Sequence, residues 1–267
     1  MPELPEVETV ARQLSARVEG RVIRRLTILD DLLRRETPPP LAGAVISSVF
    51  RAGKQVIFEL THDRRPQWWL AVHLRMTGRL LVHENPRVSI PHLRARFRLD
   101  QGSLLFVDTR RFGTFGWRER HEDILPNAVE PLSRRLTPRR FRQLIGNSRS
   151  PIKTWLLRQD RLVGLGNIYA SEILHEAHIA PQRHACDLDD EEIANLTRAT
   201  KKILRRAIRN CGTTFSDFQD ADGVEGSYQN YLFVYGRDGE GCRRCDGTIE
   251  REVQQQRSTF YCRRCQH

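Results

Sequence analysis

The segment Leu93-Arg94-Ala95-Arg96-Phe97-Arg98-Leu99 decides the fold class predicted for the central part of this 267-residue chain. Its apolar residues alternate strictly with arginines, which predicts a β-strand with one buried and one polar face. Turn residues follow at 100–102, and a second strand is expected over 104–107. Strand patterns also occur at 55–60 and 68–72, so we expect residues 21 to 130 to form antiparallel strands of a β-sandwich or flattened barrel.

Helical patterns flank this β region on both sides. Before it, apolar residues with a 3.6-residue period predict a helix over 3–19 that ends at Gly20; these residues are Val7, Val10, Ala11, Leu14 and Val18. After residue 131 the pattern is helical as far as about 211. Within it, acidic residues at 187–192 precede basic ones at 198–209, the order that a helix macrodipole favours. We therefore interpret this charge order as structural.

Four of the six cysteines form two Cys-Arg-Arg-Cys pairs, separated by the 16 residues 246–261. This spacing is typical of a structural zinc site, in which four thiolates complete a tetrahedron. Two disulfides, or a coincidence of spacing, are the alternatives. The chain start has no secretory signal, and disulfides are rare in reducing compartments. We predict one structural Zn²⁺ bound by Cys242, Cys245, Cys262 and Cys265. Cys186 and Cys211 are expected to be buried or partly buried thiols.

The charge balance indicates the class of partner. The chain has 44 Lys and Arg against 33 Asp and Glu, a formal net charge of +11. This excess favours a polyanion such as nucleic acid. Apolar residues make up 39% of the chain, enough for a folded core. No apolar run is long enough to cross a membrane, so we expect no membrane-spanning helix and a cytoplasmic location.

Pro2 is the first candidate for chemistry. Removal of Met1 would leave a secondary amine at the start of the chain. α-Amino groups are partly unprotonated near neutral pH, and amines form Schiff bases with carbonyl-like carbons. Glu3 beside it is a candidate for acid–base work. By position alone, the favoured interpretation is structural: a proline and a carboxylate at a helix start.

Six motifs, in order along the chain, resemble those of the formamidopyrimidine-DNA glycosylases. They are MPELPEVET at 1–9, the lysine turn Gly53-Lys54, HLRMTG at 73–78, DTRRFG at 108–113, LGNIYASE at 165–172 and QRSTFYC at 256–262. The fifth resembles the family's helix–two-turn–helix signature, and the sixth resembles the second half of its zinc finger. Together the motifs extend over nearly the whole chain.

The resemblance implies an α+β, multi-domain fold and a bacterial base-excision repair enzyme that acts on damaged double-stranded DNA. We expect an N-terminal helix and antiparallel β-sandwich at 1–131, a helix–two-turn–helix domain with a lesion-capping loop at 132–235, and a β-hairpin zinc finger at 236–267. The implied activities are excision of oxidised purines such as 8-oxoguanine and formamidopyrimidines through a Pro2 Schiff base, and then β,δ-elimination at the abasic site. A monomer associated with the nucleoid is the expected state.

The motif matches also imply roles for individual residues. Pro2 is the implied nucleophile, and Glu3 would move protons to and from the opening sugar. Lys54 matches the family lysine that acts near the damaged base and as the acid in β-elimination; a plain phosphate contact is the alternative. Arg257 matches the zinc-finger arginine of δ-elimination. Because arginine gives up a proton poorly, we predict that it chiefly stabilises a phosphate.

Flipping a base out of the duplex leaves a void, which apolar wedges are known to fill. Met76, Arg110 and Phe112 match the family's void-filling residues. Core packing is the alternative for Met76 and Phe112, but the turn residues beside them favour exposure. The implied DNA-backbone contacts are His92, Arg110, Arg149, Lys153 and Asn167, and the segment 213–228 corresponds to the lesion-capping loop.

One departure from the family pattern lies two residues after His92, where Arg94 replaces a frequent histidine. This difference concerns phosphate contact and lesion preference, and the proposed nucleophile is unaffected. Two alternative functions stay open at this point. One is an endonuclease VIII-like glycosylase for oxidised pyrimidines, and the other is a non-enzymatic zinc-finger DNA-binding protein.

Overall fold

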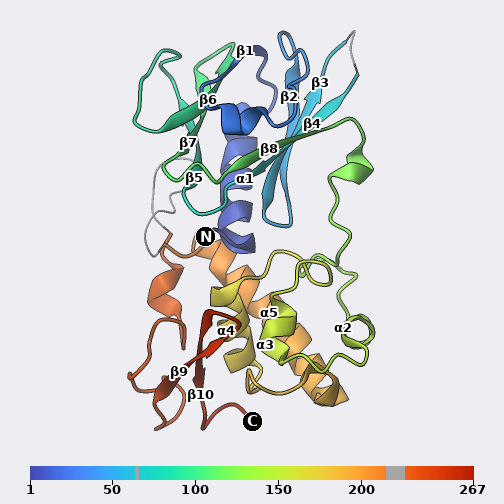
Figure 1. The fold of residues 1–267 in the computed structure, drawn as a ribbon, viewed down its shortest axis with the longest axis vertical. Coiled ribbons are helices and arrows are strands. Elements are labelled where there is room, and N and C mark those ends of the chain that lie inside the picture. Colours follow the sequence, from blue (N-terminus) through green and yellow to red (C-terminus); the bar gives the residue numbers. More distant parts are fainter. Residues whose placement is uncertain (64–65, 215–225) are drawn as a thin grey trace. The chain divides into compact units, whose positions relative to one another are not determined.

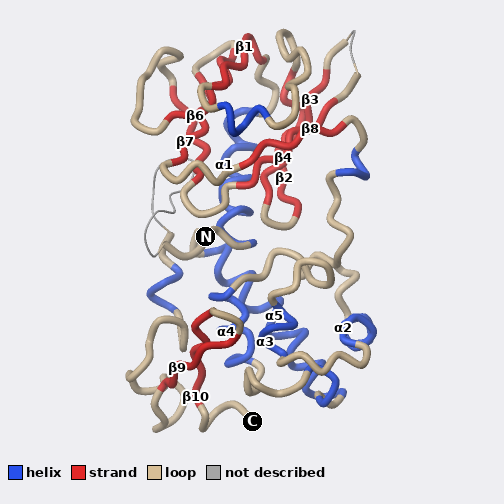
Figure 2. The backbone as a smooth tube through the Cα atoms, viewed as in Figure 1, coloured by secondary structure: helices blue, strands red, loops and turns tan. Residues whose placement is uncertain are grey.

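The structure is a computed structural model that describes residues 1–63, 66–214 and 226–267. The chain forms two compact units, one of Met1–Pro126 with Asn210–Gln229 and one of Asn127–Arg209 with Asn230–His267 (Figure 1). Strands dominate the first unit and helices the second (Figure 2). The predicted boundaries of three domains, at 131 and 235, were drawn from sequence motifs and not from the compactness of the folded chain. This division stays a prediction.

The first unit contains two four-stranded antiparallel sheets, as expected for a β-sandwich. Their strand orders are β1-β6-β7-β5 and β2-β3-β4-β8. The strands are β1 Ile23–Ile28, β2 Val45–Ala52, β3 Gln55–Thr61, β4 Trp68–His73, β5 Gly78–His83, β6 Leu93–Leu99, β7 Ser103–Asp108 and β8 Thr114–Arg118, with short 3₁₀ helices η1 Asp31–Arg34 and η2 His121–Asp123. The alternating segment at 93–99 is confirmed as β6.

Helix α1, Leu4–Val18, confirms the helix predicted over 3–19. Its apolar face, including Val7, Val10 and Leu14, belongs to the same core as residues from both sheets, such as Val56 and Phe106. Pro5 lies in the first turn, where a missing N–H costs no helical hydrogen bond. This packing holds the start of the chain against the β-sandwich.

The second unit is helical, as predicted for 131–211. It contains α2 Pro138–Ile145, α3 Ile152–Leu156, α4 Asn167–Glu176 and α5 Asp190–Arg209, together with η3 Ala185–Asp187 and η4 Tyr228–Tyr231, of which the last begins in the first unit. Phe141 of α2 and Trp155 of α3 pack with their ring centroids 5.4 Å apart. The acidic residues lie in the first turn of α5 and the basic ones in its last turn, so the macrodipole interpretation fits.

A β-hairpin closes the chain. Its strands are β9 Ile249–Gln254 and β10 Arg257–Cys262. The two turn residues, Gln255 and Gln256, have φ angles of 45° and 61°, the left-handed values that a two-residue hairpin turn requires. Arg257 therefore follows a tight, well-defined turn.

No helix within the described ranges is long and apolar enough to cross a membrane. Of the predicted lesion-capping loop, residues 215–225 lie outside the described residues.

Candidate active site and zinc centre

The residues at the start of α1 are held tightly. Pro2 is buried, and the side chains of Glu3 and Glu6 are 3% and 1% exposed. Glu6 Oε2 accepts the backbone N–H of Glu3 at 2.8 Å, within a capping box. Glu6 Oε1 accepts the N–H of Thr213, also at 2.8 Å. The proposed nucleophile thus precedes a carboxylate pair fixed in place by backbone donors.

The turn that carries Lys54 is fastened to α1. The Arg51 guanidinium donates to the Gly53 carbonyl and to Glu8 Oε2 of α1, each at 2.9 Å. Gly53 has a φ of 58°, which suits glycine at a tight hairpin turn. Lys54 itself is buried, at 9% exposure. An ion pair thus joins the lysine turn to the helix that Pro2 precedes.

His73, at the end of β4, was given no role by the sequence. Its Nδ1 accepts the N–H of Arg75 at 3.0 Å. Burial, together with the positive charges of Arg75 and Lys54, lowers the pKa of His73 to about 4. The imidazole is therefore neutral near pH 7, which the hydrogen bond to Nδ1 requires. The only signal in the sequence is its place at the head of the HLRMTG motif.

The three predicted void-filling residues all lie on the surface of the first unit. Met76 is 37% exposed and Phe112 is 51% exposed, which favours insertion over core packing for both. Arg110 is exposed as well, with Cζ 4.9 Å from the centroid of the Phe112 ring, a cation–π distance. Two apolar side chains and a guanidinium are thus exposed on the surface of the first unit.

The predicted backbone contacts His92 and Arg149 are exposed, one in each unit. His92 has a left-handed φ of 61°, and its carbonyl accepts the Asp108 N–H at 3.0 Å.

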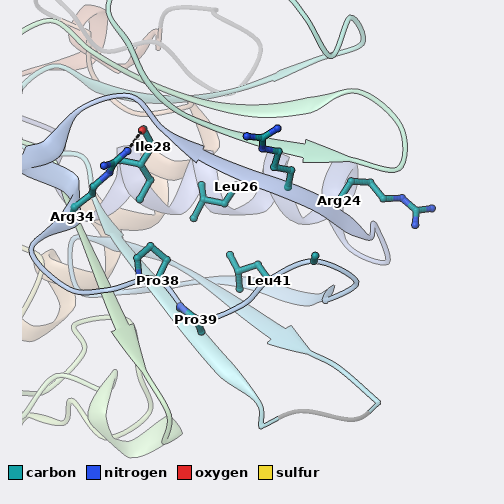
Figure 3. Close-up of a pocket in the computed structure, with 9 residues that line it drawn as sticks. Arg24, Leu26, Ile28, Arg34, Pro38, Pro39 and Leu41 are labelled. Atoms are coloured by element: carbon teal, nitrogen blue, oxygen red, sulfur yellow. Dashed lines mark hydrogen bonds between the residues drawn. The ribbon is translucent and has the colours of Figure 1, made fainter.

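A cavity of about 340 Å³ lies in the first unit, between β1 and residues 38–42 (Figure 3). Arg34 is among the residues that line it, and its Nη2 donates to the Ile28 carbonyl at 2.8 Å. The predicted site residues are not part of its lining.

Lys153 and Asn167 meet at the zinc-finger hairpin. The Lys153 side chain is 0% exposed, and its ammonium donates to the Ser258 carbonyl at 3.0 Å and to Thr259 Oγ1 at 2.7 Å. Asn167, the first residue of α4, donates from Nδ2 to the same Ser258 carbonyl at 2.9 Å. Both side chains therefore hold the backbone of Ser258, the residue after Arg257. Arg257 itself is exposed.

Glu172 is a buried carboxylate that sequence reasoning missed. Its oxygens accept the N–H groups of Phe233, Val234 and Tyr235, each at 2.9 Å. Burial raises the pKa of Glu172, while the three backbone hydrogen bonds lower it. This carboxylate fastens α4 to the segment that leads into the cysteine module. Its only signal in the sequence is its place at the end of the LGNIYASE motif.

The four cysteines of the C-terminal module form one cluster. Their Sγ atoms all lie within 4.8 Å of one another. The Sγ–Sγ distances are 3.8 Å for Cys242–Cys265, 3.6 Å for Cys245–Cys262 and 3.3 Å for Cys245–Cys265. A tetrahedron with Zn–S bonds of about 2.3 Å has edges of about 3.8 Å, whereas a disulfide requires about 2.05 Å. The cluster fits one structural Zn²⁺, and the disulfide alternative is excluded.

Backbone N–H groups close to the cysteine sulfurs favour thiolates as metal ligands. Backbone N–H groups of Arg244 and Gly247 approach Cys242 Sγ and Cys245 Sγ at 3.4 and 3.3 Å. Such outer contacts orient metal ligands. The other two cysteines lie elsewhere: Cys186 is half-buried as predicted, but Cys211 is exposed, so that expectation was wrong. Cys211 follows the end of α5 in a turn, where its backbone has a left-handed φ of 57°.

Comparisons with known proteins agree along the whole chain. Family models match at 1–115 (formamidopyrimidine-DNA glycosylase N-terminal domain), 128–219 (formamidopyrimidine-DNA glycosylase H2TH domain) and 239–267 (zinc finger found in FPG and IleRS). The formamidopyrimidine-DNA glycosylases of Chloroflexus aurantiacus and Proteus mirabilis are 40% and 39% identical, each over 100% of this chain and 98% of the relative.

Solved structures show the same likeness. The MutM (Fpg) protein of Thermus thermophilus has a TM-score of 0.89 and 36% identity over 99% of this chain and 98% of that one. Lactococcus lactis Fpg in a complex with abasic-site DNA has a TM-score of 0.89 and 32% identity, with 99% of each chain covered.

Proposed function

The chain belongs to the formamidopyrimidine-DNA glycosylase family, and we propose that Pro2, freed by the removal of Met1, is the nucleophile of its reaction. The protein is a base-excision repair DNA glycosylase that binds damaged double-stranded DNA and removes oxidised purines. The full-length family matches favour this function over the endonuclease VIII-like enzyme and over a non-enzymatic zinc-finger protein. The observation that carries the proposed mechanism is the fixed start of α1, where Pro2 precedes Glu3 and Glu6.

The reaction begins with the damaged base outside the helix, because the sugar carbon cannot be reached in a stacked duplex. The Pro2 nitrogen forms a bond to C1′ as the bond from C1′ to the base breaks; the base leaves with the electron pair and takes up the proton that the Pro2 nitrogen loses. Glu3 protonates the ring oxygen of the sugar, so the ring opens and a charged iminium forms. The buried position of Glu3 supports this role.

The iminium then drives strand cleavage. It withdraws electrons from C1′, which makes a C2′ proton acidic. Loss of that proton expels the 3′ phosphate, and loss of a C4′ proton then expels the 5′ phosphate. We assign Lys54 as the acid of the first elimination, which its buried position near His73 supports. We assign Arg257 to stabilising the departing phosphate, since its planar guanidinium binds phosphate oxygens in pairs.

Each unit contains residues that we propose as DNA contacts. We propose that His92, Arg110, Arg149 and Asn167 contact the backbone, and that Met76, Arg110 and Phe112 enter the void left by the flipped base. Lys153 adds a positive charge to phosphate binding from a buried position, while its hydrogen bonds hold β10. Cys242, Cys245, Cys262 and Cys265 would hold the zinc ion, which would stabilise the hairpin that presents Arg257; four thiolate ligands would leave no open position for catalysis. We place this work in the bacterial cytoplasm, at the nucleoid.

Borohydride trapping tests the mechanism. Borohydride reduces an iminium to a stable amine, so protein and an 8-oxoguanine:cytosine duplex should form a covalent adduct, and peptide mass spectrometry should locate it on Pro2. The Lys54→Ala variant should still form this adduct. An adduct mapped to Lys54, or none from protein whose Met1 is shown to be absent, would overturn the assignment. Competition with a thymine glycol duplex tests the substrate class, and preference for the pyrimidine lesion would contradict it.

A further inference from the structure

Asp108, the last residue of β7, lies where two loops of the first unit meet. One loop follows β4 and the other follows β7. The Asp108 side chain is 0% exposed. Its Oδ1 accepts the Thr77 hydroxyl and the Arg110 N–H (3.2 Å), and its Oδ2 accepts the Gly113 N–H at 2.8 Å. A buried carboxylate requires such donors, and here they come from both loops.

The two loops are also bonded to each other. Thr77 Oγ1 accepts the Arg110 N–H at 3.0 Å while its own hydroxyl donates to Asp108. Gly113 approaches so closely that a Cβ there would lie 2.4 Å from Cζ of Phe106 and 3.1 Å from Asp108 Oδ2. The junction is closely packed, and neither loop can move without breaking hydrogen bonds to the other.

Each residue that donates to Asp108 either has an exposed side chain itself or is next to a residue that has one. Met76 precedes Thr77, Arg110 donates its own N–H, and Phe112 precedes Gly113. We propose that Asp108 is a positioning residue that holds Met76, Arg110 and Phe112 in one fixed arrangement for entry into the duplex. This inference rests on the void-filling role in the proposed function. A preset arrangement loses less conformational entropy on insertion than three independent side chains would lose.

A second layer of charged residues supports the junction from behind. Arg94 donates from Nε to the Asp108 carbonyl at 2.8 Å and lies 3.7 Å from Oδ2 of Asp30. Arg111 makes a bidentate pair with the same Asp30 carboxylate, at 2.7 and 2.8 Å. The Arg111 backbone has a φ of 60°, a left-handed value that this pair helps to hold.

The test is the Asp108→Asn variant of the full, zinc-loaded protein. An amide offers one acceptor and one N–H₂ group, so at least one loop donor loses its partner. Single-turnover excision of 8-oxoguanine should slow by roughly tenfold to a hundredfold, the scale of a misplaced contact. Cleavage of a duplex with a preformed abasic site should change much less. Asp123→Asn, an exposed carboxylate of the same unit, is the matched control and should retain both rates.

A double-mutant cycle separates positioning from general stability. Met76→Ala should slow excision in the native background and add little in the Asp108→Asn background, because Met76 is already misplaced there. Additive effects of the two changes, or equal slowing of excision and abasic-site cleavage, would overturn the proposal. If Met76→Ala has no effect in the native background, the void-filling role itself fails, and the two failures are thus distinguishable.

The Thr77→Val variant provides a second test of the same junction in case Asp108→Asn does not fold. It removes only the hydroxyl that joins the Arg110 N–H to the Asp108 carboxylate, at nearly constant volume. It should reproduce the selective loss of excision, and a native excision rate would contradict the proposal.

Discussion

The carboxylate of Glu6 accepts a hydrogen bond at 2.8 Å from the backbone N–H of Thr213, a residue 207 positions later in the chain. The approach leaves no room for a side chain at Gly212, where a Cβ would lie 2.7 Å from Glu6 Oε1 and the φ angle is 77°. The other oxygen of Glu6 holds the N–H of Glu3. One buried carboxylate therefore links the residue beside the proposed nucleophile to the base of the predicted lesion-capping loop.

Glu6→Gln should break one of these two contacts. The amide has a single acceptor oxygen, so one buried N–H faces an N–H₂ group, at a cost of about 1–3 kcal/mol in unfolding free energy. We expect slower excision of 8-oxoguanine and a lower melting temperature. Glu122→Gln changes an exposed carboxylate, 70% exposed, and serves as the control. A native excision rate and melting temperature for Glu6→Gln would show that the contact is dispensable.

Met76→Ala should slow base excision more than strand cleavage at a preformed abasic site. Once the base is gone, less depends on filling the void that a flipped base leaves. We expect a loss on the order of tenfold in single-turnover excision, as for a misplaced contact. Leu125→Ala removes another exposed apolar side chain, 50% exposed, and should leave both rates intact. Equal slowing of the two steps by Met76→Ala would argue against the void-filling role.

The buried His73 should make the protein less stable in mild acid. Its pKa is about 4 in the folded chain, against about 6.5 when unfolded. The unfolded chain therefore binds more protons between these values, and stability falls as pH drops from about 6.5 to about 4, by at most about 3 kcal/mol. Denaturant unfolding across this window measures the effect.

A His73→Gln variant should have a flatter stability curve between pH 6.5 and 4, because glutamine keeps a neutral acceptor for the Arg75 N–H and takes up no proton. His83→Gln is the matched control. The Nδ1 of His83 likewise accepts a backbone N–H, from Asn85 at 3.0 Å, but His83 is exposed. An unchanged slope for His73→Gln would mean that His73 does not couple folding to pH in this range.

Removal of zinc should abolish DNA binding and spare most of the first unit. The cysteine cluster and the hairpin belong to the second unit, so chelation, or Cys245→Ser, should unfold the segment that presents Arg257. Duplex binding by anisotropy and hydrogen exchange over residues 1–126 measure the two effects. Cys186→Ser changes a thiol outside the cluster and should bind normally. Unchanged binding by metal-free protein would refute a folding role for the metal.

Periodic patterns and closely spaced motifs in the sequence correctly predicted parts of the fold and the metal site. The alternation at 93–99 became β6, the 3.6-residue period became α1, and the C-x₂-C pairs became one cluster. Each of these patterns reflects a local geometric repeat or a fixed ligand spacing. The exposure of Met76 and Phe112 was likewise anticipated from the turn residues beside them.

Long-range polar contacts left no comparable signal. Lys153 and Ser258 lie 105 positions apart in the chain, so the sequence gives no sign that the buried Lys153 ammonium holds β10. Asp108 and Glu172 stand in the motifs DTRRFG and LGNIYASE, but neither carboxylate was assigned a role from the sequence, because that role depends on which backbone donors the fold brings to it. Buried carboxylates are specified by the fold around them, and this is the part of the site that only the structure reveals.

The most direct measurement compares two forms of the same chain: one that starts at Pro2, and one that retains Met1 or carries an Nα-acetyl group, each verified by intact mass. Both should bind an 8-oxoguanine duplex with similar affinity. Only the form with a free Pro2 amine should excise the base and cut the strand, and the blocked form should do so at the uncatalysed background rate. Equal excision by the two forms would contradict the assignment of Pro2 as nucleophile, and with it the mechanism.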